Sequence, residues 1–381
     1  MLDYPIHKPD RSYSEQKKIT IAYFITPHGF GHAARAAAIM AALYDLNHLI
    51  NFEIYTLTPG WFFQDSLGPY FKVHPLKTDI GLIQKSPLEE DLPATLQSLD
   101  EFIPFESILL NKIAEEILNL ECQLVLCDIA PLGIAIALKA GLPSVLIENF
   151  TWDWIYQGYL HEYSKFNPFI TYLKDIFSLA NFHIQTEPIC EPDAKADLIT
   201  LPVCRKSRLS KSIIRDSLSI PEKARVVLIT MGGIQTDYRF ITRLRSVNDY
   251  YFVIPGIGDN PEMENNLILL PHHSTFYHPD LVNACDAVIG KTGYSTVSEV
   301  YSAGIPYGFV SRSNFRESSI LADFIRKHMQ GFEISEQDFC KGNWVSRLPE
   351  LLSNNRIYRN GLNGANQAAQ FILGLLIPDQ S

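Results

Sequence analysis

The chain has 381 residues, of which 46% are hydrophobic and 19% are charged, and its formal net charge is -10. This length accommodates two domains with separate cores, and the composition is that of a globular protein rather than a disordered one. The acidic balance argues against a dedicated nucleic-acid surface, which requires a basic stripe, so no nucleic-acid partner is expected.

The chain begins with a polar segment, residues 1–18, which lacks the apolar core of a secretion signal. No uninterrupted apolar run reaches the roughly 20 residues that would span a bilayer. The six cysteines form no C-x-x-C pair and no zinc-knuckle spacing, which favours a reducing compartment. We therefore expect a cytoplasmic protein.

Apolar strand candidates and helical stretches alternate through the first half of the chain, as in parallel α/β sheets. The strands are continuous apolar runs, which indicates a sheet covered on both faces. The predicted strands are 19–25, 52–57, 124–127, 144–147, 182–185 and 198–201, and the predicted helices are 33–46, 105–120, 132–140 and 169–179.

A basic, serine-rich stretch between Pro202 and Pro221 interrupts this pattern, and the cycle of strands and helices then starts again. We interpret Arg205, Arg208 and Lys211 in this stretch as a solvated linker, with phosphate or acidic-lipid binding as the alternative. The second half contains predicted strands 225–230, 251–254, 267–270, 287–289, 307–310 and 332–334, with helices 296–303 and 318–328.

The repeated pattern predicts two doubly wound, Rossmann-like domains, residues 1–205 and 206–360. Ligands of such sheets bind beyond the carboxyl ends of the strands, so the two domains are expected to face a central cleft. Residues 361–381 are predicted to form a C-terminal helix that packs back toward the first domain. The alternative for the apolar run 371–377 is peripheral contact with a membrane.

The motif His28-Gly29-Phe30-Gly31-His32 follows the first predicted strand and opens an alanine-rich helix. Its glycines allow close approach of a ligand to the main chain, and the helix start offers unpaired N–H groups to an anion. His32 can take a proton from a substrate hydroxyl at neutral pH. The alternative is that Gly29 and Gly31 only permit tight packing, with the histidines as helix caps.

The same motif also matches a dinucleotide-binding fingerprint, Gly29-x-Gly31-x-x-Ala34. That fingerprint needs an acidic residue at the end of the second strand. The second strand ends in Thr-Leu-Thr-Pro, and Glu53 lies too early within it. A nicotinamide-dependent oxidoreductase is therefore the poorer interpretation.

A second glycine turn, 290–296, follows a predicted strand in the other half of the chain. We expect Ser295 or Thr296 to cap the next helix, with Glu299 one turn inside it. A carboxylate there can accept both hydroxyls of a ribose while the turn receives phosphate. The alternative is that Glu299 is a capping-box or helix-dipole partner.

The pattern Gly-x-x-Gly-x-x-Thr-Val-Ser-Glu, followed by Ala-Gly-Ile-Pro, resembles the donor-site signature of GT-B glycosyltransferases. The similarity is to family 28, which includes the N-acetylglucosaminyltransferases that make lipid II. A closer resemblance covers most of the chain and is to the glycosyltransferase-like N-terminal region of L-arabinokinases. It rests on four shared phrases: 28–32, 148–153, 291–294, and Arg312-x-x-Phe315-x-Glu317.

The resemblance implies a GT-B fold and a role for each matching residue. His32 matches the family's candidate catalytic base, and Arg312 and Glu317 match groups that bind the donor sugar. His28, Gly29 and Gly31 are expected on the acceptor side. The residues expected to bind the donor nucleotide and diphosphate are Gly232, Gly233, His272, Gly293, Tyr294, Ser295, Thr296 and Glu299.

The aromatic segment 148–156 follows a strand and is also expected to reach the cleft. Aromatic faces suit sugar rings, which favours an acceptor-side role for Trp152. Asp153 is predicted to be catalytic, either by binding hydroxyls or by orienting His32. The alternative is that Trp152 and Trp154 pack their helix on the sheet. Four other histidines are interpreted as structural or surface residues: His74, His183, His278 and His328.

Together these features predict a glycosyltransferase that moves a sugar from a nucleotide-diphosphate donor, preferably a UDP-sugar, to a hydroxyl acceptor. The acceptor is expected to be a sugar, a lipid-linked molecule or a small molecule. The resemblance further implies inversion and no metal or other cofactor, because helix dipoles and main-chain N–H groups replace the cation. The alternatives are a nucleotide-sugar 2-epimerase and a non-catalytic nucleotide-sugar-binding protein.

Overall fold

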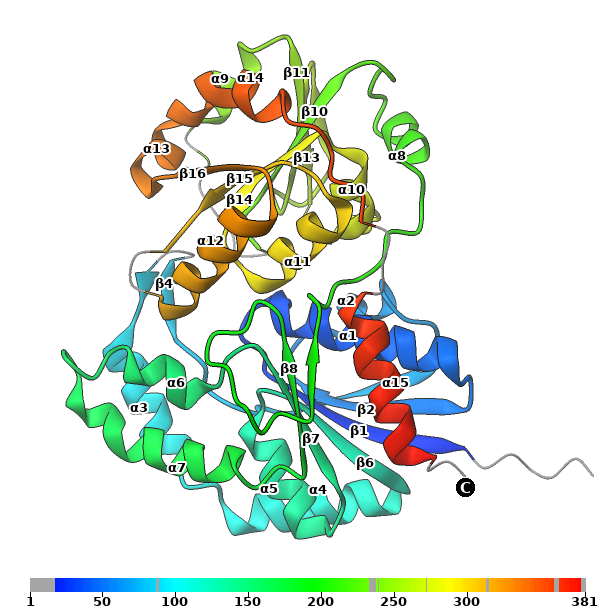
Figure 1. The fold of residues 1–381 in the computed structure, drawn as a ribbon, viewed down its shortest axis with the longest axis vertical. Coiled ribbons are helices and arrows are strands. Elements are labelled where there is room, and N and C mark those ends of the chain that lie inside the picture. The colour runs from blue at the N-terminus through cyan, green and yellow to red at the C-terminus, as the bar shows by residue number, and fades with distance from the viewer. Residues whose placement is uncertain are drawn as a thin grey trace, which may run out of the picture.

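The computed structural model describes residues 18–86, 89–232, 238, 240–271, 273–312, 315–359 and 363–377. Two of the predicted donor-site residues, Gly233 and His272, lie outside these ranges. Two seven-stranded sheets lie one above the other, each with helices on both faces (Figure 1). The first domain contains the lower sheet in this view, and the second domain contains the upper one.

The sheet of the first domain is parallel throughout, in the order β3-β2-β1-β6-β7-β8-β9. Its strands are β1 (Ile19–Ile25), β2 (Ile50–Thr56), β3 (Phe71–Pro75), β6 (Cys122–Asp128), β7 (Ser144–Glu148), β8 (Phe182–Thr186) and β9 (Leu198–Thr200). One face is covered by α3 (Leu92–Phe102), α4 (Ser107–Asn119), α5 (Pro131–Ala140), α6 (Trp152–Gln157), η1 (Ser164–Phe166) and α7 (Asn167–Phe177). The other face is covered by α1 (Phe30–Leu46), α2 (Gly60–Gln64) and α15 (Gly364–Leu376). A small antiparallel pair, β4 (Gln84–Ser86) and β5 (Glu89–Glu90), projects toward the second domain.

The sheet of the second domain has the order β12-β13-β11-β10-β14-β15-β16, with only the edge strand β12 antiparallel. Its strands are β10 (Arg225–Thr230), β11 (Tyr250–Pro255), β12 (Glu262–Glu264), β13 (Leu267–Leu270), β14 (Ala287–Lys291), β15 (Tyr307–Val310) and β16 (Gly331–Ile334). One face carries α8 (Lys211–Ser217), α10 (His278–Ala284), α11 (Tyr294–Ala303) and α12 (Arg316–His328). The opposite face carries α9 (Ile241–Arg245), α13 (Glu336–Lys341), η2 (Asn343–Arg347) and α14 (Leu348–Leu352).

Each strand predicted from an apolar run is present, with its ends within two residues of the prediction. All residues of β1 are buried, as expected for the centre of a sheet covered on both faces. The strands that the prediction missed are edge strands or short pairs. In β3, for example, Lys72 is exposed, and β12 is exposed throughout. A strand with a solvent-facing side has no continuous apolar run to mark it.

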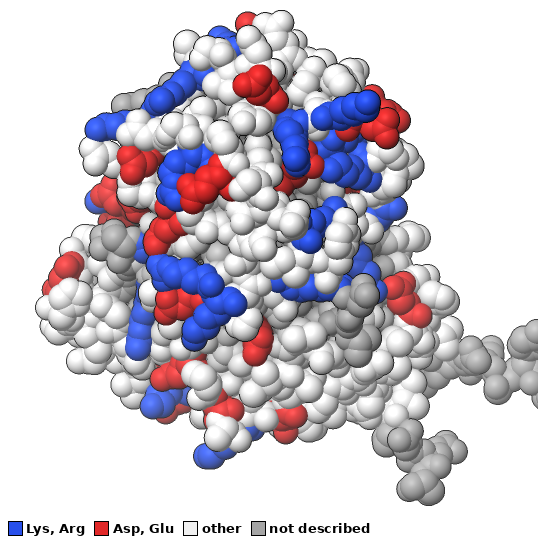
Figure 2. Space-filling view, turned by 45° about the horizontal axis from the view of Figure 1, so that its top comes forward, with Lys and Arg blue, Asp and Glu red and all other residues white. Residues whose placement is uncertain are grey.

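The C-terminal helix α15 packs against α1 of the first domain, where Ala368 and Ile372 are buried in the shared core. The alanines of α1 allow this close approach because they carry no side chain beyond Cβ. Phe371 of α15 lies edge-on to Phe182 at 6.2 Å between ring centroids. Among the described helices, none is both long and apolar enough to cross a bilayer. On the face shown in Figure 2, basic and acidic side chains are interspersed.

The topology determines where a ligand site can form. In the first sheet the strand order reverses direction between β1 and β6, and in the second between β10 and β14. Open parallel sheets bind ligands beyond the carboxyl ends of the strands at such a switch point. The two switch points therefore define the region in which the predicted site residues should converge.

Candidate functional site

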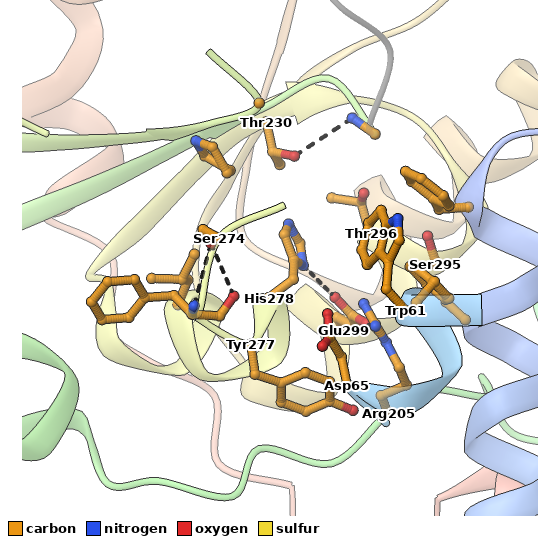
Figure 3. Close-up of a pocket in the computed structure, with 18 of the residues that line it drawn as sticks. Trp61, Asp65, Arg205, Thr230, Ser274, Tyr277, His278, Ser295, Thr296 and Glu299 are labelled. Carbon is orange, nitrogen blue, oxygen red and sulfur yellow. Dashed lines mark hydrogen bonds and ion pairs between the residues drawn. The ribbon is translucent and has the colours of Figure 1, made fainter. Parts of the chain in front are cut away.

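Two adjoining cavities lie between the domains at these switch points. The first has about 840 Å³ of empty space and is lined by Phe30 and Trp61 of the first domain, and by Arg205, His278 and Glu299 (Figure 3). The second has about 680 Å³. Its lining includes the predicted residues His28, Gly29, Gly31, His32, Gly293, Tyr294, Arg312 and Glu317. Gly232, Ser295 and Thr296 line both cavities, so a single extended ligand can occupy the two.

Glu299 is buried at the base of the first cavity, on α11. Its Oε1 accepts a hydrogen bond from Arg205 Nε at 3.0 Å, and its Oε2 lies 2.7 Å from His278 Nδ1 (Figure 3). Burial alone raises the pKa of Glu299, but Arg205 and His278 outweigh it and hold that pKa below its ordinary value. The carboxylate is therefore ionised, and each oxygen retains a lone pair for a ligand hydroxyl.

The start of α11 differs from its prediction. Gly293 is the N-cap, and no side chain caps the helix, so the expectation that Ser295 or Thr296 does so is wrong. The residues line the cavities instead. An uncapped start leaves main-chain N–H groups available to an anion.

The contacts of Arg205 show that the interpretation of residues 202–221 as a solvated linker is wrong. Its side chain is only 8% exposed, pairs with Glu299 and lies over the rings of Phe62 and Tyr277. Arg208 donates hydrogen bonds to main-chain carbonyls of the first domain, and the stretch continues into α8. A basic run has the same local sequence whether it meets water or a buried carboxylate, so composition did not separate the two.

In the second cavity, His32 forms a buried pair with Asp128, with 2.9 Å between Nδ1 and Oδ1. Arg35 donates to both oxygens of Asp128, from Nε at 2.8 Å and from Nη2 at 2.6 Å. Burial raises the pKa of Asp128, but the Arg35 guanidinium and the His32 hydrogen bond outweigh it and hold that pKa below its ordinary value. An ionised carboxylate can only accept, so His32 Nδ1 donates and Nε2 is left as the basic nitrogen.

The structure corrects the assignment of Asp153 as the group that orients His32, because Asp128 occupies that position. Asp153 lies on α6 and lines neither cavity. Trp152 is likewise not a cavity residue: it is 1% exposed and donates from Nε1 to Asp79 Oδ2 at 3.1 Å. Trp154 is buried as well, which agrees with the alternative that both tryptophans pack α6 on the sheet.

A cationic environment lies where the cavities meet. Gly232 has φ of +73°, and a Cβ there would lie 3.1 Å from Lys291 Cε. Because Gly232 has no side chain, the Lys291 side chain can lie close to its backbone at the wall that the two cavities share. Burial and the nearby Arg312 lower the pKa of Lys291 to about 7. Among the described residues, no hydrogen-bond or ion-pair partner is found for Lys291 Nζ. An anion placed here would meet Lys291 and the start of α11.

The predicted donor-sugar residues Arg312 and Glu317 line the second cavity. Glu317 Oε1 accepts from Asn149 Nδ2 at 2.8 Å, and Asn149 Oδ1 accepts from Arg35 Nη1 at 2.7 Å. Hydrogen bonds therefore connect His32, through Asp128 and Arg35, to α12 of the second domain. This connection couples the geometry of the two domains at the cavity.

Sequence reasoning missed Asp128, Arg35 and His278, and assigned no role to Lys291. Asp128 had a usable signal, because it ends an apolar strand, and polar residues at strand ends reach a ligand site in a parallel sheet. That strand, β6, pairs with β1. His278 had none, because a histidine at a helix start is common on a protein surface.

Two doubly wound domains enclose the paired cavities, with His32 and Asp128 at one and Glu299 at the other, and this architecture is that of the GT-B fold. The chain belongs to Glycosyl transferase family 1, whose sequence profile matches residues 19–349. The predicted fold class and the resemblance are thus confirmed.

The chain is also similar to individual proteins. The chain is 29% identical over 364 residues to an L-arabinokinase of Arabidopsis thaliana, which covers 94% of this chain and 34% of that protein. The chain therefore spans about a third of this relative's length. Among solved structures, a UDP-glucosyltransferase from Polygonum tinctorium has a TM-score of 0.61 at 13% identity, covering 95% of this chain and 96% of the other. UGT89C1 of Arabidopsis thaliana, solved with UDP, has a TM-score of 0.59 at 14% identity, covering 94% and 100%. These structures share the fold.

Proposed function

We propose that this glycosyltransferase uses a nucleotide-diphosphate sugar, with uridine as the nucleoside, and transfers the sugar to an acceptor hydroxyl with His32 as the base catalyst. The observation that carries the proposal is the shared wall of the two cavities. The nucleoside end, anchored at Glu299, and the reacting end, at His32, are joined at Gly232, Ser295 and Thr296.

Each part of the proposed donor matches a group of cavity residues. The ribose hydroxyls donate to Glu299, and the aromatic side chains Trp61 and Tyr277 provide apolar walls for the nucleoside. The diphosphate lies at the shared wall, against Lys291 and the start of α11. The sugar then reaches the second cavity, where Arg312 and Glu317 bind its hydroxyls.

The reaction follows from this placement. His32 Nε2 removes the proton of the acceptor hydroxyl, and the acceptor oxygen attacks the anomeric carbon. The bond from that carbon to the phosphate oxygen breaks, and its electron pair leaves with the nucleoside diphosphate. Attack opposite the leaving group inverts the anomeric centre. In this proposal Lys291 and the α11 main-chain N–H groups stabilise the leaving charge, and no metal takes part.

The donor site is tested by comparing UDP with 2′-deoxy-UDP in titration calorimetry. We expect wild-type protein to bind UDP about 10-fold more tightly, because a hydrogen bond to a charged group contributes roughly 1.5–3 kcal/mol. Glu299→Gln should reduce this preference, whereas the control Glu264→Gln, on exposed β12, should preserve it. Absence of UDP binding at millimolar concentration would contradict the donor site, and an undiminished preference in Glu299→Gln would contradict the role of Glu299.

The lowered pKa of Lys291 predicts that UDP affinity depends on pH. With a pKa of about 7 in the free protein, much of Lys291 is neutral at pH 8, and the bound diphosphate raises that pKa by favouring the charged form. Binding should therefore take up protons, so the contribution of Lys291 to UDP affinity falls as pH rises above 7. Calorimetry at pH 8 in two buffers of different ionisation enthalpy measures this uptake. Lys291→Met should abolish it and weaken UDP binding about 10-fold or more, and equal uptake in both proteins would contradict the assignment.

A further inference from the structure

A third cavity opens beside the second and extends beyond the proposed donor site, with which it shares Arg312. It is a groove with about 1640 Å³ of empty space, open to solvent. Its walls are the β4–β5 pair, the turn between α6 and η1, and the start of α12. We call it the polar groove, after Glu90, Tyr159, Ser311 and Arg312, which line it.

Three buried polar atoms, each in a residue that lines this groove, have no hydrogen-bond partner among the described residues. They are the Tyr159 hydroxyl, the Ser311 hydroxyl and Arg312 Nε. Tyr159 and Arg312 are each only 6% exposed. A buried polar atom without a partner costs roughly 1–3 kcal/mol, and native proteins rarely contain them without a functional reason. Their gathering at one groove indicates a ligand that supplies the missing hydrogen bonds.

The groove connects to the reaction centre. Arg312 and Phe315 line both the polar groove and the second cavity, which holds His32. The guanidinium of Arg312 lies 3.6 Å from the Phe315 ring centroid, and its Nη1 donates to Glu90 Oε1 at 3.3 Å. These contacts hold Arg312 in place, so a molecule in the groove can extend past it toward His32.

The lining indicates the chemistry of that molecule. Acidic and basic side chains both line the groove, among them Lys85, Glu162 and Arg316. Charges of both signs do not select an anion. A neutral molecule with many hydroxyls suits them, because each hydroxyl both donates and accepts. A flat apolar molecule would leave the Tyr159 hydroxyl, the Ser311 hydroxyl and Arg312 Nε without hydrogen-bond partners.

We infer that the polar groove binds the acceptor and that the acceptor is a neutral sugar or short glycan, with its reacting hydroxyl directed past Arg312 to His32. This inference rests on the proposed transfer reaction and specifies its acceptor class.

Saturation-transfer NMR with two sets of probes tests the inference without requiring turnover. The sugars are glucose, galactose, xylose and maltose, and the phenols are 4-nitrophenol and 4-methylumbelliferone. We expect one or more sugars to bind the wild-type protein, and at least fivefold weaker binding in Tyr159→Phe/Ser311→Ala. Tyr251→Phe, a change on β11 outside all three cavities, is the matched control and should bind as wild type.

The two deleted hydroxyls have no hydrogen-bond partner among the described residues, so the double variant should unfold at or above the wild-type temperature. Binding of phenols but of none of the sugars would overturn the inference, as would equal sugar binding by the double variant and wild type. UDP titration of the same samples reports the donor site separately. Sugar binding without UDP binding by the wild-type protein would contradict the proposed donor. UDP binding without sugar binding would contradict only the acceptor class.

Discussion

Replacing His32 with alanine is expected to lower kcat about 10²- to 10⁴-fold, the range attributed to general base catalysis. The variant loses the nitrogen that removes the acceptor proton. It retains Glu299, Lys291 and the start of α11, so the Kd for UDP should remain within about twofold of wild type by the same reasoning. Release of UDP from a UDP-sugar measures kcat, and calorimetry measures the Kd.

His48→Ala is the matched control, because His48 is exposed and lines none of the three cavities. It should leave both quantities unchanged. Undiminished turnover in His32→Ala would remove His32 from the base role while leaving the donor site intact. A parallel loss of UDP affinity would instead indicate that the variant disturbs the wall between the two cavities.

Asp128→Ala is expected to destabilise the fold by about 3–5 kcal/mol, the usual cost of removing one partner from a buried ion pair. Arg35 is 1% exposed and donates to both oxygens of Asp128, so the variant leaves a buried guanidinium without its counter-charge. Urea denaturation measures the change. A loss below about 1 kcal/mol would show that the pair has little structural importance.

The double variant Arg35→Met/Asp128→Leu separates stability from catalysis. Replacing a buried ion pair by apolar residues removes the unpaired charge, so the double variant should recover part of the free energy of unfolding. The rest is lost with the hydrogen bonds from Arg35 to Asn149 and Thr186. Turnover should remain low, because nothing then holds His32 Nδ1 as a donor. Recovery of full activity in the folded double variant would contradict the positioning role of Asp128.

Much of the fold was predictable because its determinants are local. The central strands β1 and β10 lie at their predicted residues, since a strand buried on both faces must be apolar along its whole length. The glycine turns that follow β1 and β14 were predictable for a related reason, because glycine followed by a helix start has a short-range signature. That signature also carried the resemblance to GT-B glycosyltransferases, which the family assignment confirmed.

The tertiary structure alone decided which polar groups act together. His32 and Asp128 are 96 positions apart, and Arg205 and Glu299 are 94 apart. The sequence by itself determined the class of protein and the two glycine turns, so it selected His32 and Glu299 as candidates, and both line the cavities. It did not determine their partners, because the identity of a neighbour across a sheet or a domain boundary depends on strand order and packing. For that reason Asp153 was selected in place of Asp128. Asp153 lies on α6 and lines neither of the two cavities, whereas Asp128 ends β6 beside β1.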